Sequence, residues 1–183
     1  VLGIIHESFD SIPITQSYIL QLHKILYSHM NNPAAGRTKT VQNYISATYP
    51  DGHTETLFIP LAPYETPDAI DRLCAEYNRV IGNLELEPLI AIPVFIHDFL
   101  CIHPFNDGNG RMSRLLTTLL LYRSGFFVGK YISLEAKIAK NKDLYYDALS
   151  ASQDGWHEGT DDPVPFIKYL LGTILAAYRD FED

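Results

Sequence analysis

The sequence predicts an all-α fold consisting of a single helical domain, with six to eight helices around a buried central helix and one β-hairpin. Three observations lead to this prediction. Apolar residues recur at three- and four-residue intervals through most of the chain. Only residues 37–62 are instead rich in Thr, Val, Tyr and Ile on both sides of a turn sequence. The 183 residues contain no repeat and no internal linker, and a chain of this length can bury a core by itself.

The first third of the chain predicts one helix and then the hairpin. Residues 1–10 carry too short a pattern to assign. Thr15 is suited to cap a helix that ends at about Asn31, because apolar residues recur along it at helical spacing. The hairpin spans about 37–60, with its turn at 49–53. Two strands alone are marginal in water, so the hairpin should lie against the helices, either as a lid or docking edge or as a surface decoration.

The remaining two thirds predict helices only. Thr66 as cap and Pro67 at the first helical position open a helix that Gly82 can close. Pro88 to Ile102 is apolar almost all round, so we expect it to be the central buried helix. Further helices are expected after residue 110 up to Ser124, from Ser133, from Asn141 or Asp143 to about Gln153, and from Asp161 to the C-terminus.

Composition excludes several functional classes. With 14 Lys and Arg against 22 Asp and Glu, the net charge of −8 argues against a nucleic-acid-binding surface. Cys74 and Cys101 lie in helical patterns without paired spacing, which indicates buried thiols of a reducing compartment. No apolar run reaches the roughly 18 residues of a membrane span, so we expect a cytoplasmic protein. Because the chain begins at Val1 and not at Met, we also expect it to be part of a longer chain extending upstream.

The segment from His103 to Arg114 carries the chemistry of the sequence. Two glycines in a turn before an apolar helix allow successive backbone N–H groups to converge on one anion. Two arginines follow at a spacing of three, on one face of the first turns of that helix. Cations are slightly unfavourable at this end of a helix, which suggests that a polyanion binds there. The residues concerned are Gly108, Asn109, Gly110, Arg111 and Arg114.

Two further residues of this segment suggest catalysis and metal binding. His103 is a titratable base, and Asp107 supplies a hard oxygen ligand of the kind that Mg²⁺ prefers. The segment lies between two of the most apolar helical stretches, which would hold a reactive loop rigidly.

The pattern His103-x-Phe105-x-Asp107-Gly108-Asn109-Gly110-Arg111-x-x-Arg114 resembles the signature of the Fic proteins at every specified position. The hairpin resembles the Fic flap, and Tyr145-Tyr146-x-x-Leu149 resembles the family's nucleotide-side helix. The resemblance implies a helical fold that transfers the AMP moiety of ATP to a hydroxyl side chain of a target protein, with release of pyrophosphate.

By the same resemblance, each motif residue has an expected role. His103 would be the general base that takes the proton of the target Ser, Thr or Tyr hydroxyl, and Asp107 would bind Mg²⁺ bridging the α- and β-phosphates. Phe105 is assigned to the core as the anchor of the loop. Phosphate binding is expected from Gly108, Asn109 and Gly110, which would cradle the phosphates, and from Arg111 and Arg114, which would hold the β- and γ-phosphates.

The resemblance also extends to adenine and target binding. Tyr146 occupies a position where family members often place a tyrosine near the base, and Gln153 stands where many carry Asn. Plain packing is the alternative for Tyr145 and Tyr146. An extended target segment would dock on the flap through main-chain hydrogen bonds, at Val41, Gln42, Asn43, Tyr44 and Ile45.

Two alternative functions remain open from the sequence. One is transfer of another phosphoryl-containing group, either UMP or the γ-phosphate, although the intact Gly108-Asn109-Gly110 favours nucleotide transfer. The other is a nucleotide-binding or scaffolding domain, against which the intact His103 and Asp107 count.

The sequence also leads to an expectation about regulation. Family members are commonly restrained by a helix bearing Ser/Thr-x-x-x-Glu, whose glutamate pairs with the second motif arginine. No Glu of this chain has Ser or Thr four residues before it. We therefore expect Arg114 to be unpaired, and an inhibitory helix to come from upstream of Val1 or from a partner. Self-modification is a further possible outcome.

Overall fold

The computed structural model describes residues 1–182 and confirms the all-α fold with one hairpin. In this part of the chain there are eight α-helices, three 3₁₀ turns and one pair of strands. The helices are α1 (Leu2–Ser8), α2 (Gln16–Leu26), α3 (Thr66–Gly82), α4 (Pro88–Ile102), α5 (Asn109–Arg123), α6 (Leu134–Lys140), α7 (Lys142–Gln153) and α8 (Val164–Glu182). The strands are β1 (Ile45–Thr48) and β2 (Thr54–Phe58), and the 3₁₀ turns are Phe9–Ser11, Pro63–Glu65 and Val128–Lys130.

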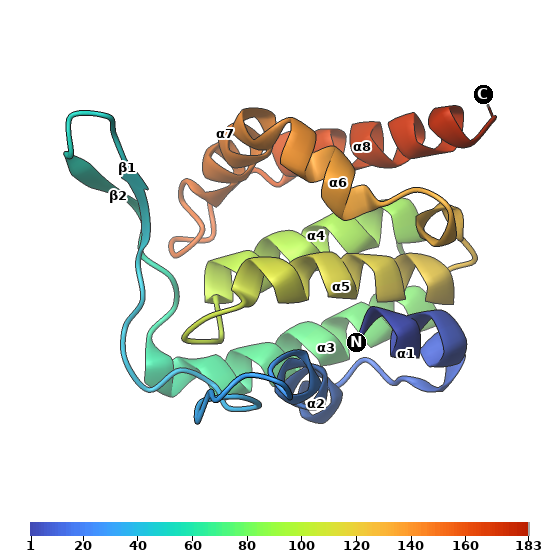
Figure 1. Ribbon diagram of the computed structural model, residues 1–183, viewed down its shortest axis with the longest axis horizontal. Coiled ribbons are helices and arrows are strands. Elements are labelled where there is room, and N and C mark those ends of the chain that lie inside the picture. The colour runs from blue at the N-terminus through green and yellow to red at the C-terminus, as the bar shows by residue number, and fades with distance from the viewer. Residues whose placement is uncertain (183) are drawn as a thin grey trace.

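The helices form three tiers with α4 at the centre (Figure 1). In this view α4 and α5 cross the middle, α6 to α8 lie above them, and α1 to α3 lie below. Helix α4 contacts α3, α5, α7 and α8. Ten of its residues are buried, as its nearly unbroken apolar sequence predicts. The predicted central helix is confirmed, and it delivers His103 from a rigid support.

The loop between α4 and α5 is anchored in this core. The side chain of Phe105 is fully buried, between Phe99 of α4 and His23 of α2. The ring thus fixes the loop to both helices, which confirms its assignment to the core.

The predicted hairpin is confirmed, but its paired strands cover only residues 45–58 of the span 37–60 expected for it. The strands are antiparallel with Thr48 opposite Thr54, and the Tyr49 N–H donates to the His53 carbonyl at 2.8 Å across the predicted turn. Residues 37–44 were expected to extend the first strand but are not paired with the second. They run beside the loop that follows α4 and hydrogen-bond to it instead.

Three helix ends differ from the sequence prediction. Helix α2 ends at Leu26, five residues before Asn31, and the hydroxyl of the next residue, Tyr27, binds Asp107. Thr66 is not a cap, because its hydroxyl donates to the Ala62 carbonyl at 3.0 Å and it lies inside α3. Residues 2–8, unassigned from sequence, form α1.

The buried position expected for the two cysteines is confirmed. Cys74 and Cys101 are buried and form no disulfide. Among residues 1–182, no helix combines the length and apolarity that crossing a bilayer requires.

Candidate active site

His103 follows the last turn of α4 in a left-handed conformation, with φ 51° and ψ 63°. Its Nδ1 lies 3.2 Å from the Leu100 carbonyl oxygen. A carbonyl only accepts, so Nδ1 carries the proton and Nε2 keeps a free lone pair. Burial, together with the nearby charge of Lys39, lowers the pKa of His103 to about 4, although the Leu100 carbonyl acts to raise it. At neutral pH the ring is therefore neutral, as a general base must be.

The start of α5 offers free N–H groups to an anion. Gly108 precedes the helix with φ 88°, and the first helical bond runs from the Met112 N–H to the Gly108 carbonyl at 2.8 Å. Within residues 1–182, the N–H groups of Asn109, Gly110 and Arg111 have no backbone partner. A Cβ on Gly108 would come within 2.8 Å of the Tyr27 hydroxyl. Glycine thus keeps the turn open at the positive end of the helix dipole.

Asn109 contributes to the loop mainly through its side chain. This buried amide donates to the Phe105 carbonyl at 2.8 Å, and its oxygen accepts from the Phe105 N–H at 2.9 Å. The side chain thus closes the loop upon itself, which leaves the backbone N–H of Asn109 as the group available to a phosphate.

Asp107 is held in an ionised state at the surface of the loop. Its Oδ2 accepts from the Tyr27 hydroxyl at 2.5 Å and from Arg111 Nη2 at 3.1 Å, and its Oδ1 accepts from the Gly108 N–H at 2.8 Å. These donors, the Tyr27 hydroxyl first, lower the pKa of the Asp107 carboxyl. Its side chain is 69% exposed. One ionised, accessible carboxylate fits Mg²⁺, which typically takes few protein ligands and shares substrate phosphates.

His23 of α2 supports this loop from below. Its Nδ1 accepts from the Gly36 N–H at 2.9 Å, so Nε2 carries the proton and donates to the Asp107 carbonyl at 2.9 Å. The ring stacks on Phe105 with centroids 3.7 Å apart. Burial lowers the pKa of His23, which keeps the ring in this neutral form.

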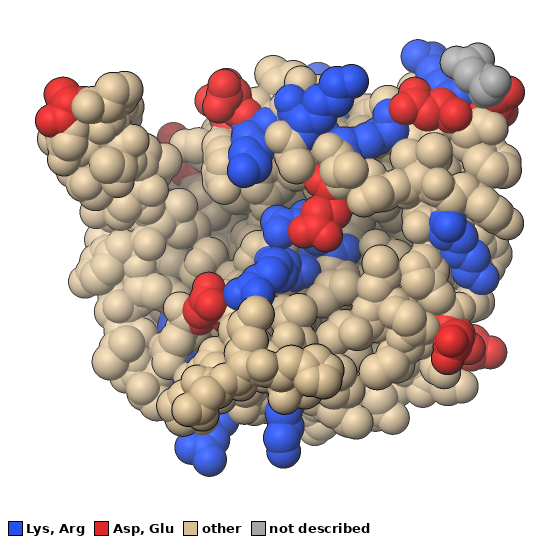
Figure 2. All heavy atoms as spheres, viewed as in Figure 1, with Lys and Arg blue, Asp and Glu red and all other residues tan. Residues whose placement is uncertain are grey.

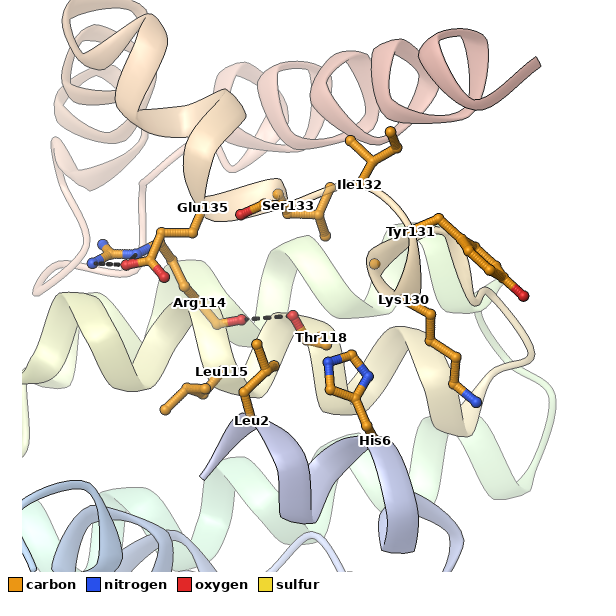
Figure 3. A pocket seen from close by; sticks show the side chains of 12 residues that line it. Leu2, His6, Arg114, Leu115, Thr118, Lys130, Tyr131, Ile132, Ser133 and Glu135 are labelled. Atoms are coloured by element: carbon orange, nitrogen blue, oxygen red, sulfur yellow. Dashed lines mark hydrogen bonds and ion pairs between the residues drawn. The ribbon is translucent and has the colours of Figure 1, made fainter. Parts of the chain in front are cut away.

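The sequence led us to expect an unpaired Arg114, but in the structure Arg114 forms an ion pair. Its Nε and Nη2 each lie 3.1 Å from Oε1 of Glu135, which comes from the first turn of α6. Figure 3 shows this pair at the edge of a cavity of about 300 Å³ between α1, α5 and the segment before α6. Glu135 follows Tyr131 by four residues, so no Ser/Thr-x-x-x-Glu pattern could reveal it. The packing of α6 over α5 brings this carboxylate to the arginine.

The charge on this face contrasts with the net charge of −8 of the whole chain. Figure 2 shows Lys and Arg side chains gathered in a hollow across the middle of the molecule, with a few acidic side chains beside them. By comparison with Figure 1, the hollow lies over α5 and beneath α6 and α7. A local basic hollow in an acidic protein suits a polyanionic ligand.

The two residues expected near adenine differ in their surroundings. Tyr146 is exposed and contacts the edge of Tyr145, which is buried against Phe166. Gln153 is buried, and its Nε2 has no hydrogen-bond partner within residues 1–182. It borders a cavity of about 550 Å³ between β2, the end of α7 and the loop 154–158.

Four of the five flap residues divide into two groups, and the fifth lies in a strand. Val41 and Tyr44 are exposed, and their N–H groups have no backbone partner in the described part of the chain. Gln42 and Asn43 are bound internally: the Gln42 amide donates to the carbonyls of Asn43 and Pro60, and the Asn43 amide donates into the loop after α4. Ile45 opens β1.

A second cluster of metal-compatible side chains lies away from this loop. The ligand atoms of His97, Asp98 and Asp161 are within 4.8 Å of one another. His97 Nε2 bonds Asp161 at 3.0 Å, and Asp98 accepts from the Trp156 ring at 3.0 Å. His97 is thus a buried histidine whose hydrogen bond is made within the protein.

Sequence reasoning missed three residues that shape the site: His23, Tyr27 and Lys39. His23 lies in the last turns of α2 and Tyr27 directly follows that helix, yet nothing local shows that either residue meets a loop about 80 residues away. Lys39 lies in a polar stretch that reads as exposed, but the residue is only 2% exposed.

Comparison with known proteins places this site in a family. The family model described as the Fic/DOC family matches residues 13–121, more than half of the chain and including the whole motif. The chain belongs to the Fic/DOC family. The pattern at 103–114 and the hairpin formed by β1 and β2 both lie within the matched residues.

Several relatives support this assignment. The protein adenylyltransferase fic-1 of Caenorhabditis elegans is 29% identical over 183 residues, covering 98% of this chain and 30% of its own length. A Fido domain-containing protein of Dictyostelium discoideum is 30% identical, covering 69% of this chain and 87% of its own. The chain thus spans about 30% of the length of the nematode relative.

Solved structures show the same fold. A Fic domain-containing signaling protein of Bacteroides thetaiotaomicron superposes with a TM-score of 0.74 at 25% identity, covering 96% of this chain and 65% of its own. Fic-1 of C. elegans (residues 134–508) gives 0.70 at 23% identity, covering 97% and 47% respectively.

Proposed function

We propose that this Fic protein transfers AMP from ATP to a hydroxyl side chain of a target protein and releases pyrophosphate. The observation that carries the proposal is the arrangement within one loop: a neutral His103 with Nε2 free, followed by three N–H groups without backbone partners at the start of α5. The naming of several relatives as protein adenylyltransferases supports it.

In the proposed reaction, His103 Nε2 takes the proton of the target hydroxyl. The hydroxyl oxygen forms a bond to the α-phosphorus while the bond from that phosphorus to the bridging oxygen breaks, and pyrophosphate leaves. A positioned base of this kind typically contributes 10²–10⁴ in rate. The low pKa of His103 in the free protein keeps it unprotonated, and the negative charge of a bound polyphosphate would raise that pKa toward the value a base needs.

The start of α5 would receive the phosphates. The free N–H groups of Asn109, Gly110 and Arg111 are fixed by the helix, so they need no reorganisation as charge develops on the phosphate oxygens. Arg111 and Arg114 would hold the β- and γ-phosphates. Because Arg114 already binds Glu135, ATP would have to displace this carboxylate, and so would a regulatory glutamate supplied from upstream or by a partner.

Asp107 would hold Mg²⁺, which would supply positive charge to the phosphates of ATP. The accessible, ionised carboxylate fits that role. We assign the adenine to the cavity beside Gln153, because the residue expected near the base borders it.

The experiment compares ATP labelled at the α-phosphate with ATP labelled at the γ-phosphate, each with Mg²⁺ and a cell extract or the protein alone. We expect label in protein from the α-phosphate only. Transfer of γ-label would show a kinase instead, and transfer only from UTP would show uridylylation. His103→Ala should abolish transfer while leaving the Kd for ATP nearly unchanged, because the base acts on the hydroxyl and not on the nucleotide.

A further inference from the structure

Five successive carbonyl groups at the end of α4 and in the catalytic loop accept hydrogen bonds from the two arms of the flap. Lys39 Nζ donates to the Ile102 carbonyl at 3.0 Å, and the Lys39 N–H donates to the Pro104 carbonyl at 2.7 Å. Asn43 Nδ2 donates to the carbonyls of His103 at 3.1 Å and Phe105 at 3.0 Å. From the second arm, the Leu61 N–H donates to the Cys101 carbonyl at 3.2 Å.

The two polar side chains that make these bonds also bind each other. Lys39 Nζ donates to Asn43 Oδ1 at 2.8 Å. Lys39 is 2% exposed, and burial lowers its pKa to about 8. A buried amine is unfavourable unless its donors are satisfied, and the two partners of Lys39 are the carbonyl at the end of α4 and the Asn43 side chain, which itself binds the catalytic loop.

The catalytic loop needs external support at this point. His103 is in the left-handed region, which a non-glycine residue adopts only at an energetic cost. The last carbonyls of α4 also have no helical partners of their own. The bonds from Lys39 and Asn43 satisfy these carbonyls and thereby fix the backbone that carries the imidazole.

We propose that Lys39 and Asn43 are positioning residues, which hold the His103 backbone in its left-handed conformation and couple target docking on the flap to the placement of the base. Asn43 lies between Val41 and Tyr44, two exposed residues of the expected docking segment whose N–H groups have no backbone partner within residues 1–182. A target strand that binds here therefore contacts the segment whose Asn43 side chain hydrogen-bonds to the backbone of His103. The readout of transfer rests on the proposed function, whereas the readout of His103 titration does not.

The first test compares two single variants, each of which changes one side-chain amide to a carboxylate. Asn43→Asp keeps the shape and the acceptor for Lys39 but removes both donors to the catalytic loop. Asn78→Asp is the matched control, because the Asn78 amide likewise donates to a backbone carbonyl, that of Ile14 at 2.9 Å, far from the site. We expect kcat for AMP transfer to fall about 10- to 100-fold in Asn43→Asp, since misplacement of a catalytic group by an ångström has effects of this size.

The accompanying measurements separate positioning from binding and stability. The Kd for ATP should stay within about twofold of wild type in both variants, because neither residue is among those expected to bind the phosphates. Asn78→Asp should keep wild-type kcat with a similar loss in Tm. Equal kcat values in Asn43→Asp and Asn78→Asp, or a loss in Asn43→Asp that lies entirely in ATP affinity, would overturn the proposal.

The second test follows the imidazole of His103 directly, by NMR titration of its ring. Lys39→Met removes both the bonds and the positive charge, so the titration midpoint of His103 should rise and kcat should fall. Lys39→Arg retains charge and donors and should restore both toward wild type. The groups that act on this imidazole are Lys39, the Leu100 carbonyl and the surrounding apolar core.

This titration also separates the two proposals from each other. If the wild-type protein transfers no AMP, the proposed function fails, and the His103 midpoint still tests the support from Lys39. An unchanged midpoint in Lys39→Met, or identical behaviour of the Met and Arg variants, would show that Lys39 does not position the base.

Discussion

Replacing Glu135 by Gln should increase the affinity of this Fic protein for ATP. In the structure, Glu135 Oε1 lies 3.1 Å from both Nε and Nη2 of Arg114, the arginine that we expect to hold the terminal phosphates. ATP must displace this carboxylate before Arg114 can bind it. Glutamine has nearly the same shape but no charge, so Arg114 becomes available without a change in packing.

The exposure of the pair sets the size of the effect. The side chain of Glu135 is 63% exposed and that of Arg114 is 26% exposed, so water and salt screen their attraction. Exposed ion pairs typically contribute about 0.2–1 kcal/mol. If ATP no longer has to break this ion pair, the same free energy is added to ATP binding, which corresponds to a Kd lower by a factor of about 1.4–5. Both arginine nitrogens bind the same carboxylate oxygen, which is weaker than two-oxygen pairing and favours the lower part of this range.

Calorimetric titration with ATP and AMP, at low and at high salt, would measure the effect. AMP lacks the terminal phosphates, so its Kd should change little, and the gain for ATP should shrink as salt rises. Asp180→Asn is the matched control, because it breaks the other ion pair of α6, between Lys137 and Asp180, without touching Arg114. The reasoning is refuted if ATP binds Glu135→Gln no better than wild type, or if Asp180→Asn produces the same gain.

Three further predictions concern the base, the metal ligand and the flap. Because the pKa of His103 in the free protein is lowered to about 4, kcat/KM for ATP should stay flat from about pH 7 to 5 and fall only as the base takes a proton below that; half-loss near pH 6.5 would contradict this. Tyr27→Phe removes the hydroxyl that Asp107 and Arg111 share, so we expect the Mg²⁺ concentration for half-maximal activity to change several-fold with little change in Tm, and an unaltered Mg²⁺ response would count against a metal role of this carboxylate. Tyr44→Pro removes an exposed N–H donor, so modification of an external target should fall well below any loss of ATP binding, and equal losses would assign this strand to fold stability alone.

Local sequence determined the helices and the chemistry of the motif. Helix α4 could be predicted because its apolar residues leave no polar face, and α6 because Ser133 caps it, accepting from the Ala136 N–H at 3.1 Å. The contiguous residues of the loop 103–114 were also sufficient to indicate a base, a metal ligand and an anion site. Apolar patterning, helix caps and contiguous motifs can be recognised from sequence because each involves residues only a few positions apart.

Only the tertiary structure decided which groups support or compete with these residues. His23 meets Asp107 across 84 positions, Lys39 meets Ile102 across 63, and Arg114 meets Glu135 across 21. Each contact depends on how helices and loops pack, and a buried lysine or a paired arginine has the same local sequence as an exposed one. Periodicity records which face of an element is apolar but not which distant group that face will meet. The sequence therefore predicted the reactive groups of this protein, while the fold determined their protonation, the residues that hold them in place and the carboxylate that competes for Arg114.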